Sequence, residues 1–200
     1  MNKNKALLFK NKYRIESIRL KNWDYSDPGF YFVTICTKDR KNIFGEIVDG
    51  KMVLNKYGYI VKYCWRDLPN HYKNCIVDSY IIMPNHFHGI IRIKNVHHYN
   101  NVEMGFKPIS DAGYKPASTW YKQYSLFEMI RGFKTFSSKK ITRLRQRLCR
   151  GENLVNHAIY FRWQKSYYEH IIRNEQSLYR IRQYIKNNPI NWDVDRNFKK

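Results

Sequence analysis

The 200-residue chain has no long hydrophobic run. Its longest apolar stretches, such as YIIMP and GIIRI, fall far below the roughly 20 residues that a membrane-spanning helix needs, so no membrane partner is expected. The apolar patch ALLF near the N-terminus is too short for the core of a signal peptide. We therefore predict a cytoplasmic protein.

Cysteine is also scarce, and the four cysteines include no CxxC pair. This spacing argues against a zinc knuckle or a thioredoxin-like motif and predicts reduced, mostly buried thiols. The chain also lacks the glycine-rich P-loop of nucleotide-hydrolysing enzymes. Any catalysis is therefore expected to proceed without an external energy source.

Acidic residues are few, because 16 Asp and Glu stand against 37 Lys and Arg, which gives a formal charge of +21. So large a charge on a short chain favours a polyanionic partner. Aromatic residues make up 16% of the chain and include 17 tyrosines. Aromatic rings stack on unpaired bases while cations neutralise phosphates, so the composition favours single-stranded nucleic acid. The alternative is an ordinary basic protein from a Lys- and Asn-rich proteome.

Hydrophobic periodicity predicts one domain over residues 1–200, of class α+β. The predicted order is βαββαβ and a last helix, which specifies a ferredoxin-like antiparallel sheet with helices on one face. Residues 1–24 form a basic N-terminal segment and residues 94–121 a mobile loop. The predicted elements are strand 31–37, an inserted hairpin 45–54, helix 56–68 ended by Pro69, strands 76–84 and 86–93, helix 126–148, strand 161–172 and a helix from 175 that Pro189 stops.

The long helix begins with a capping box, Ser125 followed by Glu128. Its predicted apolar positions are Phe127, Ile130, Phe133, Phe136 and Ile141. The rest of its surface is basic, and the DNA-binding candidates there are Arg131, Lys134, Lys139 and Lys140. The same residues also fit an ordinary solvated helix face.

Two histidines open the strand HFHGIIRI. Side chains alternate along a strand, so His86 and His88 share one face and Phe87 points to the other. Imidazole is a common ligand of transition metals, so the pair is a plausible half of a metal site. The alternative is a strand with two histidines at its solvated start.

On the last helix, Tyr184 and Asn188 lie four residues apart and therefore one above the other. A tyrosine hydroxyl can attack a phosphate that a metal polarises, and an amide oxygen can supply a third metal ligand. The alternative is that Tyr184 is an aromatic at the edge of the core and Asn188 an ordinary last-turn residue before proline.

Four blocks in the right order resemble the single-tyrosine HUH transposases, and most closely the REP-associated tyrosine transposases. The first two blocks are YFVTICTKDRKNIFGEI and SYIIMPNHFHGIIRI, and the last two are WQKSYYEHIIRN and RIRQYIKNNP. The His-hydrophobic-His element in MPNHFHG is the most specific feature of this resemblance.

The resemblance implies that His86 and His88 bind a divalent metal, Mg²⁺ or Mn²⁺, that Tyr184 is the nucleophile and that Asn188 is the third, helix-borne ligand. It further implies a bacterial, DNA-associated enzyme that cleaves and rejoins single-stranded DNA near a hairpin through a 5′-phosphotyrosine link. Glu169, His170 and Arg173 receive no chemical role. A homodimer in which Tyr184 comes from a second subunit stays open at this point.

Two other functions fit part of the sequence. A ferredoxin-like sheet with exposed aromatics is also typical of non-catalytic modules that bind single-stranded nucleic acid, although no RNP-type aromatic motif is present. A metal-dependent ribonuclease could use the histidines as acid and base without a covalent step. Trapping a protein–DNA adduct separates the transposase hypothesis from both.

Overall fold

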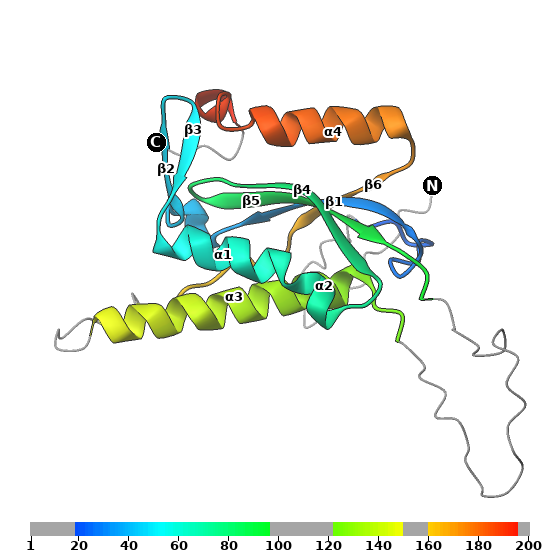
Figure 1. The fold of residues 1–200 in the computed structure, drawn as a ribbon, viewed down its shortest axis with the longest axis horizontal. Coiled ribbons are helices and arrows are strands. Elements are labelled where there is room, and N and C mark those ends of the chain that lie inside the picture. Colours follow the sequence, from blue (N-terminus) through cyan, green and yellow to red (C-terminus); the bar gives the residue numbers. More distant parts are fainter. Residues whose placement is uncertain (1–18, 97–121, 150–159, 196–200) are drawn as a thin grey trace, which may run out of the picture.

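A computed structural model of the chain describes residues 19–96, 122–149 and 160–195. An antiparallel sheet lies between helices on its two faces (Figure 1). The strands are β1 Gly29–Cys36, β2 Gly45–Val48, β3 Lys51–Leu54, β4 Cys75–Ile82, β5 His86–Ile93 and β6 Tyr168–Ile172. The helices are α1 Lys56–Arg66, α2 Leu68–His71, α3 Leu126–Leu148 and α4 Glu175–Asn187, with short 3-10 turns at Lys38–Arg40 and Trp192–Val194.

The main sheet has the strand order β4-β5-β1-β6, and all its neighbouring strands run antiparallel. The predicted α+β class is therefore confirmed. The order also agrees with the split βαβ arrangement of a ferredoxin-like fold, because β5 separates β1 from β4 and β1 separates β5 from β6. β2 and β3 pair with each other as the predicted inserted hairpin, turning at Asp49 and Gly50, both of positive φ.

The main sheet buries side chains on both of its faces. Its strands carry apolar residues at consecutive positions, so apolar side chains point to both sides. On one face Tyr31, Val33, Phe87 and Ile91 form the main core, which α1 and α3 cover. On the opposite face a smaller cluster, Phe32, Ile90, Ile172, Leu178 and Ile185, holds α4 against the sheet. The extra C-terminal helix therefore lies on the face that the other helices leave open (Figure 1).

Several local predictions are confirmed. The Ser125 and Glu128 side chains form the reciprocal capping box that starts α3, and the helix ends at Leu148 as expected. The Asn174 side chain caps α4 by accepting from the Ser177 amide. β4 and β5 form the expected hairpin around Pro84 and Asn85, with His86 as the first residue of its second strand.

Three predictions are wrong in detail. Pro69 does not simply end a helix, because it lies in the first turn of α2, where its missing N–H costs nothing. The final strand covers only Tyr168–Ile172, since residues 161–167 make a single bridge between Trp163 and Thr37. Phe136 is 47% exposed rather than part of the core. Residues 1–18 of the predicted basic segment and 97–121 of the predicted loop lie outside the described residues.

Gly89 on β5 allows a close approach between the sheet and α1. A Cβ at this position would lie 2.6 Å from the Trp65 ring and 2.7 Å from the Phe87 ring. Trp65 can therefore pack directly on the strand that carries the two histidines.

None of the helices within residues 19–96, 122–149 and 160–195 is long and apolar enough to cross a membrane.

Candidate metal centre and active site

His86 and His88 lie on the α4 face of β5, opposite Phe87, as strand alternation predicts. Both side chains are buried, with 0% and 1% exposure. The alternative of two histidines at a solvated strand start is therefore wrong. The Trp192 ring stacks over His86 at 5.8 Å between centroids, and the Phe32 ring stacks on His88 at 5.4 Å. The C-terminal segment and β1 thus enclose the pair.

Each imidazole is held at its Nδ1 atom by a neighbouring side chain. His86 Nδ1 lies 2.8 Å from Asn85 Oδ1, and His88 Nδ1 lies 2.8 Å from the Thr34 hydroxyl directly across the sheet. Asn85 Oδ1 can only accept, since Asn85 Nδ2 donates to the Arg40 carbonyl, so the proton of His86 is on Nδ1. This tautomer aims the Nε2 lone pair inward, an arrangement typical of histidines that bind metals.

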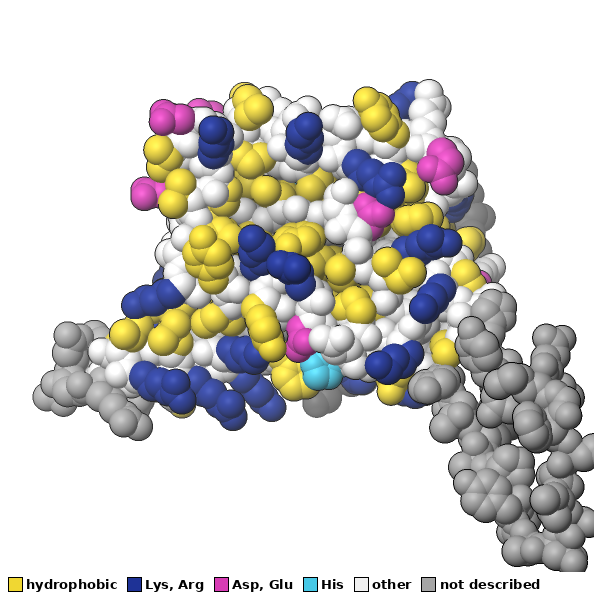
Figure 2. Space-filling model, viewed as in Figure 1, with side chains coloured by type: hydrophobic (Ala, Val, Ile, Leu, Met, Phe, Trp, Pro, Cys, Tyr) yellow, Lys and Arg dark blue, Asp and Glu magenta, His cyan; other side chains and the backbone are white. Residues whose placement is uncertain are grey.

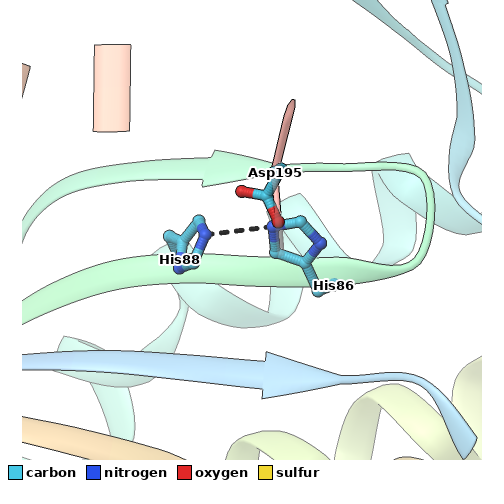
Figure 3. A group of neighbouring side chains, drawn as sticks. All are labelled: His86, His88 and Asp195. Atoms are coloured by element: carbon cyan, nitrogen blue, oxygen red, sulfur yellow. Dashed lines mark hydrogen bonds between the residues drawn. The ribbon is translucent and has the colours of Figure 1, made fainter. Parts of the chain in front are cut away.

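The two Nε2 atoms converge to 3.0 Å from each other (Figure 3). When both Nδ1 atoms donate, two lone pairs meet at this point and repel unless a proton or a metal ion lies between them. A separation of 3.0 Å is also about the distance between adjacent ligands of an octahedral ion with bonds of about 2.1 Å. The geometry of the histidine pair therefore favours a shared cation.

Tyr184 reaches this pair from α4. Its hydroxyl lies 3.2 Å from His88 Nε2 and 3.4 Å from Asp195 Oδ2. The Phe32 ring packs edge-on against the Tyr184 ring and fixes its direction, while the residue stays 43% exposed. The sequence left open whether a second subunit supplies this tyrosine, and the structure brings Tyr184 and the histidines together within one chain.

Asn188 lies one turn beyond Tyr184, at the C-terminal end of α4, and is only 2% exposed. Its Nδ2 atom donates to Asp195 Oδ2 at 3.1 Å. Its Oδ1 atom is buried and has no hydrogen-bond partner within the described part of the chain. A buried amide oxygen without a partner costs about 1–3 kcal/mol, so a ligand in this position would be stabilising.

Asp195 completes the group. One ligand atom from each of His86, His88 and Asp195 lies within 4.8 Å of the others, and Figure 3 shows the carboxylate above the two imidazoles. Two imidazoles, a carboxylate and an orphaned amide oxygen are a chemically suitable donor set for a divalent metal. The residues present therefore fit the metal that the sequence resemblance implied.

Sequence reasoning predicted His86, His88, Tyr184 and Asn188 as site residues, and the structure brings them together with Asp195, which was not predicted. The one signal for Asp195 was an acidic residue shortly after the helix in a chain with few acids. Pro189 and the turn at Trp192–Val194 bring the chain back over β5, and no periodicity in the sequence encodes this return. Thr34 and Asn85 were missed as well, because their role depends on cross-strand register and on ring orientation.

An ion pair fixes α4 to the edge strand β4. Arg182 donates from Nε to Asp78 Oδ1 at 2.9 Å and from its terminal nitrogen to Oδ2 at 2.6 Å. These hydrogen bonds from Arg182 lower the pKa of Asp78, against the opposing effect of burial. Because Arg182 lies two residues before Tyr184, the pair holds the tyrosine-bearing turn of α4 in place.

Asp78→Asn is expected to lower the free energy of unfolding by about 1 kcal/mol at pH 7, the upper end for a partly exposed bidentate pair. The pKa of Asp78 is lower in the folded state than its ordinary value of 3.8, so the contribution is present above that pH. It is lost as the pH falls below about 4, where the variant and wild type should converge. Urea unfolding at both pH values measures this.

The matched control for this test is Arg180→Gln, which changes an exposed arginine on the same helix. An equal loss of unfolding free energy in Asp78→Asn and Arg180→Gln would mean that Asp78 stabilises the fold through the overall charge of α4 rather than through Arg182. A difference that persists at low pH would also contradict the ion-pair explanation.

Among the predicted DNA-binding residues of α3, Arg131, Lys139 and Lys140 are exposed. Lys134 differs, because its ammonium donates to the carbonyls of Gln164 at 2.6 Å and Lys165 at 3.0 Å. Burial lowers the pKa of Lys134, and the charge of Arg19 lowers it further. Lys134 therefore holds the segment before β6 against α3, and we do not retain it as a DNA contact.

Comparison with known proteins places the chain in a family. None of the protein-family models compared with the chain matches it. An uncharacterized protein of Haemophilus influenzae is 36% identical over 180 residues, which cover 90% of each chain. The chain belongs to the family of this Haemophilus protein. Identity at this level over nearly the full length indicates a shared fold, although the relative's description states no activity.

A solved structure identifies the fold of this family. A REP-associated tyrosine transposase bound to a REP hairpin superimposes with a TM-score of 0.51 at 14% identity, covering 89% of this chain and 74% of that one. The resemblance to REP-associated tyrosine transposases stated from the sequence motifs is thereby confirmed at the level of the fold.

Proposed function

We propose that this protein is a metal-dependent endonuclease and strand transferase that cleaves single-stranded DNA near hairpins. The observation that carries the proposal is the contact between the Tyr184 hydroxyl and His88 Nε2, which converges with His86 Nε2 beside the orphaned Asn188 oxygen. A nucleophile placed next to a metal-ligand set is the arrangement that phosphoryl transfer by a tyrosine requires. The transposase-like fold supports the same reaction class.

In the proposed reaction the Tyr184 oxygen attacks the phosphorus of a phosphodiester. A bond forms between that oxygen and phosphorus, and the bond from phosphorus to the 3′ oxygen of the preceding nucleotide breaks. The phenolic proton passes to the Asp195 carboxylate, which already accepts from the Tyr184 hydroxyl. The 3′ oxygen leaves and takes a proton from water. The products are a 5′-phosphotyrosine link and a free 3′-hydroxyl.

His86, His88 and Asn188 would hold the metal, together with the Asp195 oxygen that does not take the phenolic proton. When bound, a divalent ion neutralises charge on the phosphate and so makes the phosphorus more electrophilic. The carboxylate and amide oxygens of this set suit Mg²⁺ and Mn²⁺, and these are the ions that we propose. Asn85 fixes the tautomer of His86 that this role needs, Thr34 holds the His88 ring at its Nδ1 atom, and Trp192 shields His86 from water.

The proposed substrate is single-stranded DNA that carries a hairpin. The structural neighbour is bound to a REP hairpin, and the charge of +21 suits a polyanion. The covalent link conserves the energy of the phosphodiester, so a second 3′-hydroxyl can reverse the attack and join a different strand. This reversibility accounts for strand transfer without nucleotide hydrolysis.

The test uses single strands that carry a hairpin and a 5′ extension, labelled at the 3′ end and incubated with Mn²⁺. We expect a labelled protein band that survives boiling in detergent, and a second product whose 3′ end a polymerase can extend. Cleavage without the adduct would favour a metal-dependent nuclease that forms no covalent link with DNA. Binding without cleavage in either Mn²⁺ or Mg²⁺ would favour the non-catalytic module.

A further inference from the structure

The outer face of α1 carries two exposed tyrosines that the site does not use. Tyr59 and Tyr63 are 60% and 57% exposed and lie four residues apart, so their rings are neighbours on one side of the helix. The inner side of the same helix carries the buried residues Gly58, Val61, Cys64 and Trp65. The two tyrosines are therefore not needed for the core, and together they form an aromatic surface facing solvent.

Cations surround this aromatic surface. The Lys140 ammonium from α3 lies 4.1 Å from the centre of the Tyr63 ring, and that of Lys62 lies 6.0 Å from the Tyr59 ring. The tyrosines line a groove of about 540 Å³ together with Lys62, Arg66, Asp67 and Asn70. Asp67 is the acidic member of this lining, and its oxygens already accept from Asn70 and pair with His71.

A second aromatic pair extends the surface along α3. The rings of His71 and Phe136 stack at 5.7 Å with an angle of 15° between their planes, and Phe136 is 47% exposed. The exposed lysines and arginines of α3 continue beside them, namely Lys139, Lys140, Arg143 and Arg147. Figure 2 shows hydrophobic and basic side chains intermixed over α1 and along α3, with few acidic ones in that area.

We propose that this α1–α3 surface, defined by Tyr59, Tyr63, Lys62, Arg66 and Lys140, is a second binding site for single-stranded DNA, in which unpaired bases stack on the two tyrosines. Exposed rings flanked by cations are the combination by which proteins hold single strands without sequence readout. In a duplex the base faces are covered by their neighbours, so the two tyrosine rings cannot stack on them. Protein interfaces, in contrast, are depleted of lysine.

The surface is distinct from the proposed active site. α1 and α3 cover one face of the sheet, whereas α4 lies on the other (Figure 1). The histidines and Asp195 lie on the α4 side, beside Tyr184. A DNA single strand held in the proposed active site would therefore reach the α1–α3 surface by passing around the edge of the sheet. The nucleotides bound at this surface would be a flanking segment, away from the cleaved phosphate. This site goes beyond the proposed cleavage reaction and can be tested without it.

The test measures fluorescence anisotropy of a labelled oligo(dT) of about 16 nucleotides, which forms no hairpin, in EDTA so that no cleavage occurs. The double variant Tyr59→Ala/Tyr63→Ala is expected to bind at least about tenfold more weakly than wild type. Tyr59→Phe/Tyr63→Phe keeps both rings and should bind within about twofold of wild type. Tyr179→Ala removes an equally exposed tyrosine from α4 and serves as the matched control.

Charge is tested separately through salt dependence. Lys62→Gln/Lys140→Gln should reduce the slope of log affinity against log salt by about 1.4, since each neutralised phosphate contributes about 0.7 for single strands. The alanine variant should weaken binding at every salt concentration with the slope unchanged. Thermal unfolding confirms that each variant is folded, as expected for changes on an exposed helix face.

Three results would overturn the proposal. The first is equal binding by the alanine variant and wild type. The second is an equal loss in Tyr179→Ala, which would show that any exposed tyrosine contributes. The third is an equal loss of affinity in Tyr59→Phe/Tyr63→Phe, which would show that the tyrosines bind DNA through their hydroxyls rather than by stacking. None of these results depends on whether Tyr184 cleaves DNA, so failure here and failure of the cleavage reaction are distinguishable.

Discussion

Tyr184→Phe is expected to bind hairpin-bearing single strands as tightly as wild type and to form no covalent adduct. The substitution keeps the ring that packs edge-on against Phe32 and removes only the oxygen that must attack phosphorus. Loss of a nucleophile costs on the order of 10⁶ in kcat in well-characterised hydrolases, so cleavage should fall below detection. A gel of detergent-boiled reactions measures the adduct, and an electrophoretic mobility shift measures binding.

Tyr179→Phe is the matched control, because it removes a hydroxyl from an exposed tyrosine of the same helix and should leave the adduct intact. An adduct in Tyr184→Phe would contradict the assignment, and peptide mapping would then locate the linked residue. Tyr168 of β6 would be the first alternative. It is the cross-strand partner of Thr34 on β1, which in turn is paired with His88, so Tyr168 lies on the same face as the histidines. Tyr167 is a poorer alternative because its hydroxyl is buried and burial raises its pKa.

His88→Gln and His86→Gln are expected to abolish both divalent-metal binding and metal-dependent cleavage. Glutamine keeps a polar group near the position of Nε2 but is a much weaker ligand than imidazole. Both histidines are buried, so alanine would also leave a cavity and unpaired neighbours, and glutamine separates ligand loss from misfolding more cleanly. The readouts are Mn²⁺ titration calorimetry and cleavage of the labelled hairpin strand.

Thermal unfolding supplies a readout besides activity. Mn²⁺ that binds the folded protein alone should raise the Tm of wild type, and neither glutamine variant should respond. His71→Gln, at an exposed histidine of α2, is the control and should show the wild-type rise. Asn188→Ala should retain a weakened response and lose about 10- to 100-fold in activity, because the imidazoles remain. A full Mn²⁺ response in both histidine variants would contradict the metal centre.

The sequence by itself determined the secondary structure around the site. The alternation of β5 placed His86 and His88 together and Phe87 opposite, because successive side chains of a strand must point to opposite faces. The four-residue spacing of Tyr184 and Asn188 placed them on one side of α4, because a helix turns every 3.6 residues. Capping signals at Ser125 and Asn174 gave the starts of both long helices. All of these depend on neighbours along the chain.

Only the tertiary structure decided how these pieces meet. The docking of α4 through Leu178 and Ile185 brought Tyr184 to His88, and the return of the chain after Pro189 buried the histidines and added Asp195. The same packing gave Lys134 a structural role and left Tyr59 and Tyr63 exposed on α1. Contacts of this kind join residues up to about a hundred positions apart, and they depend on which apolar surfaces pack together. Local periodicity specifies each surface but not its partner.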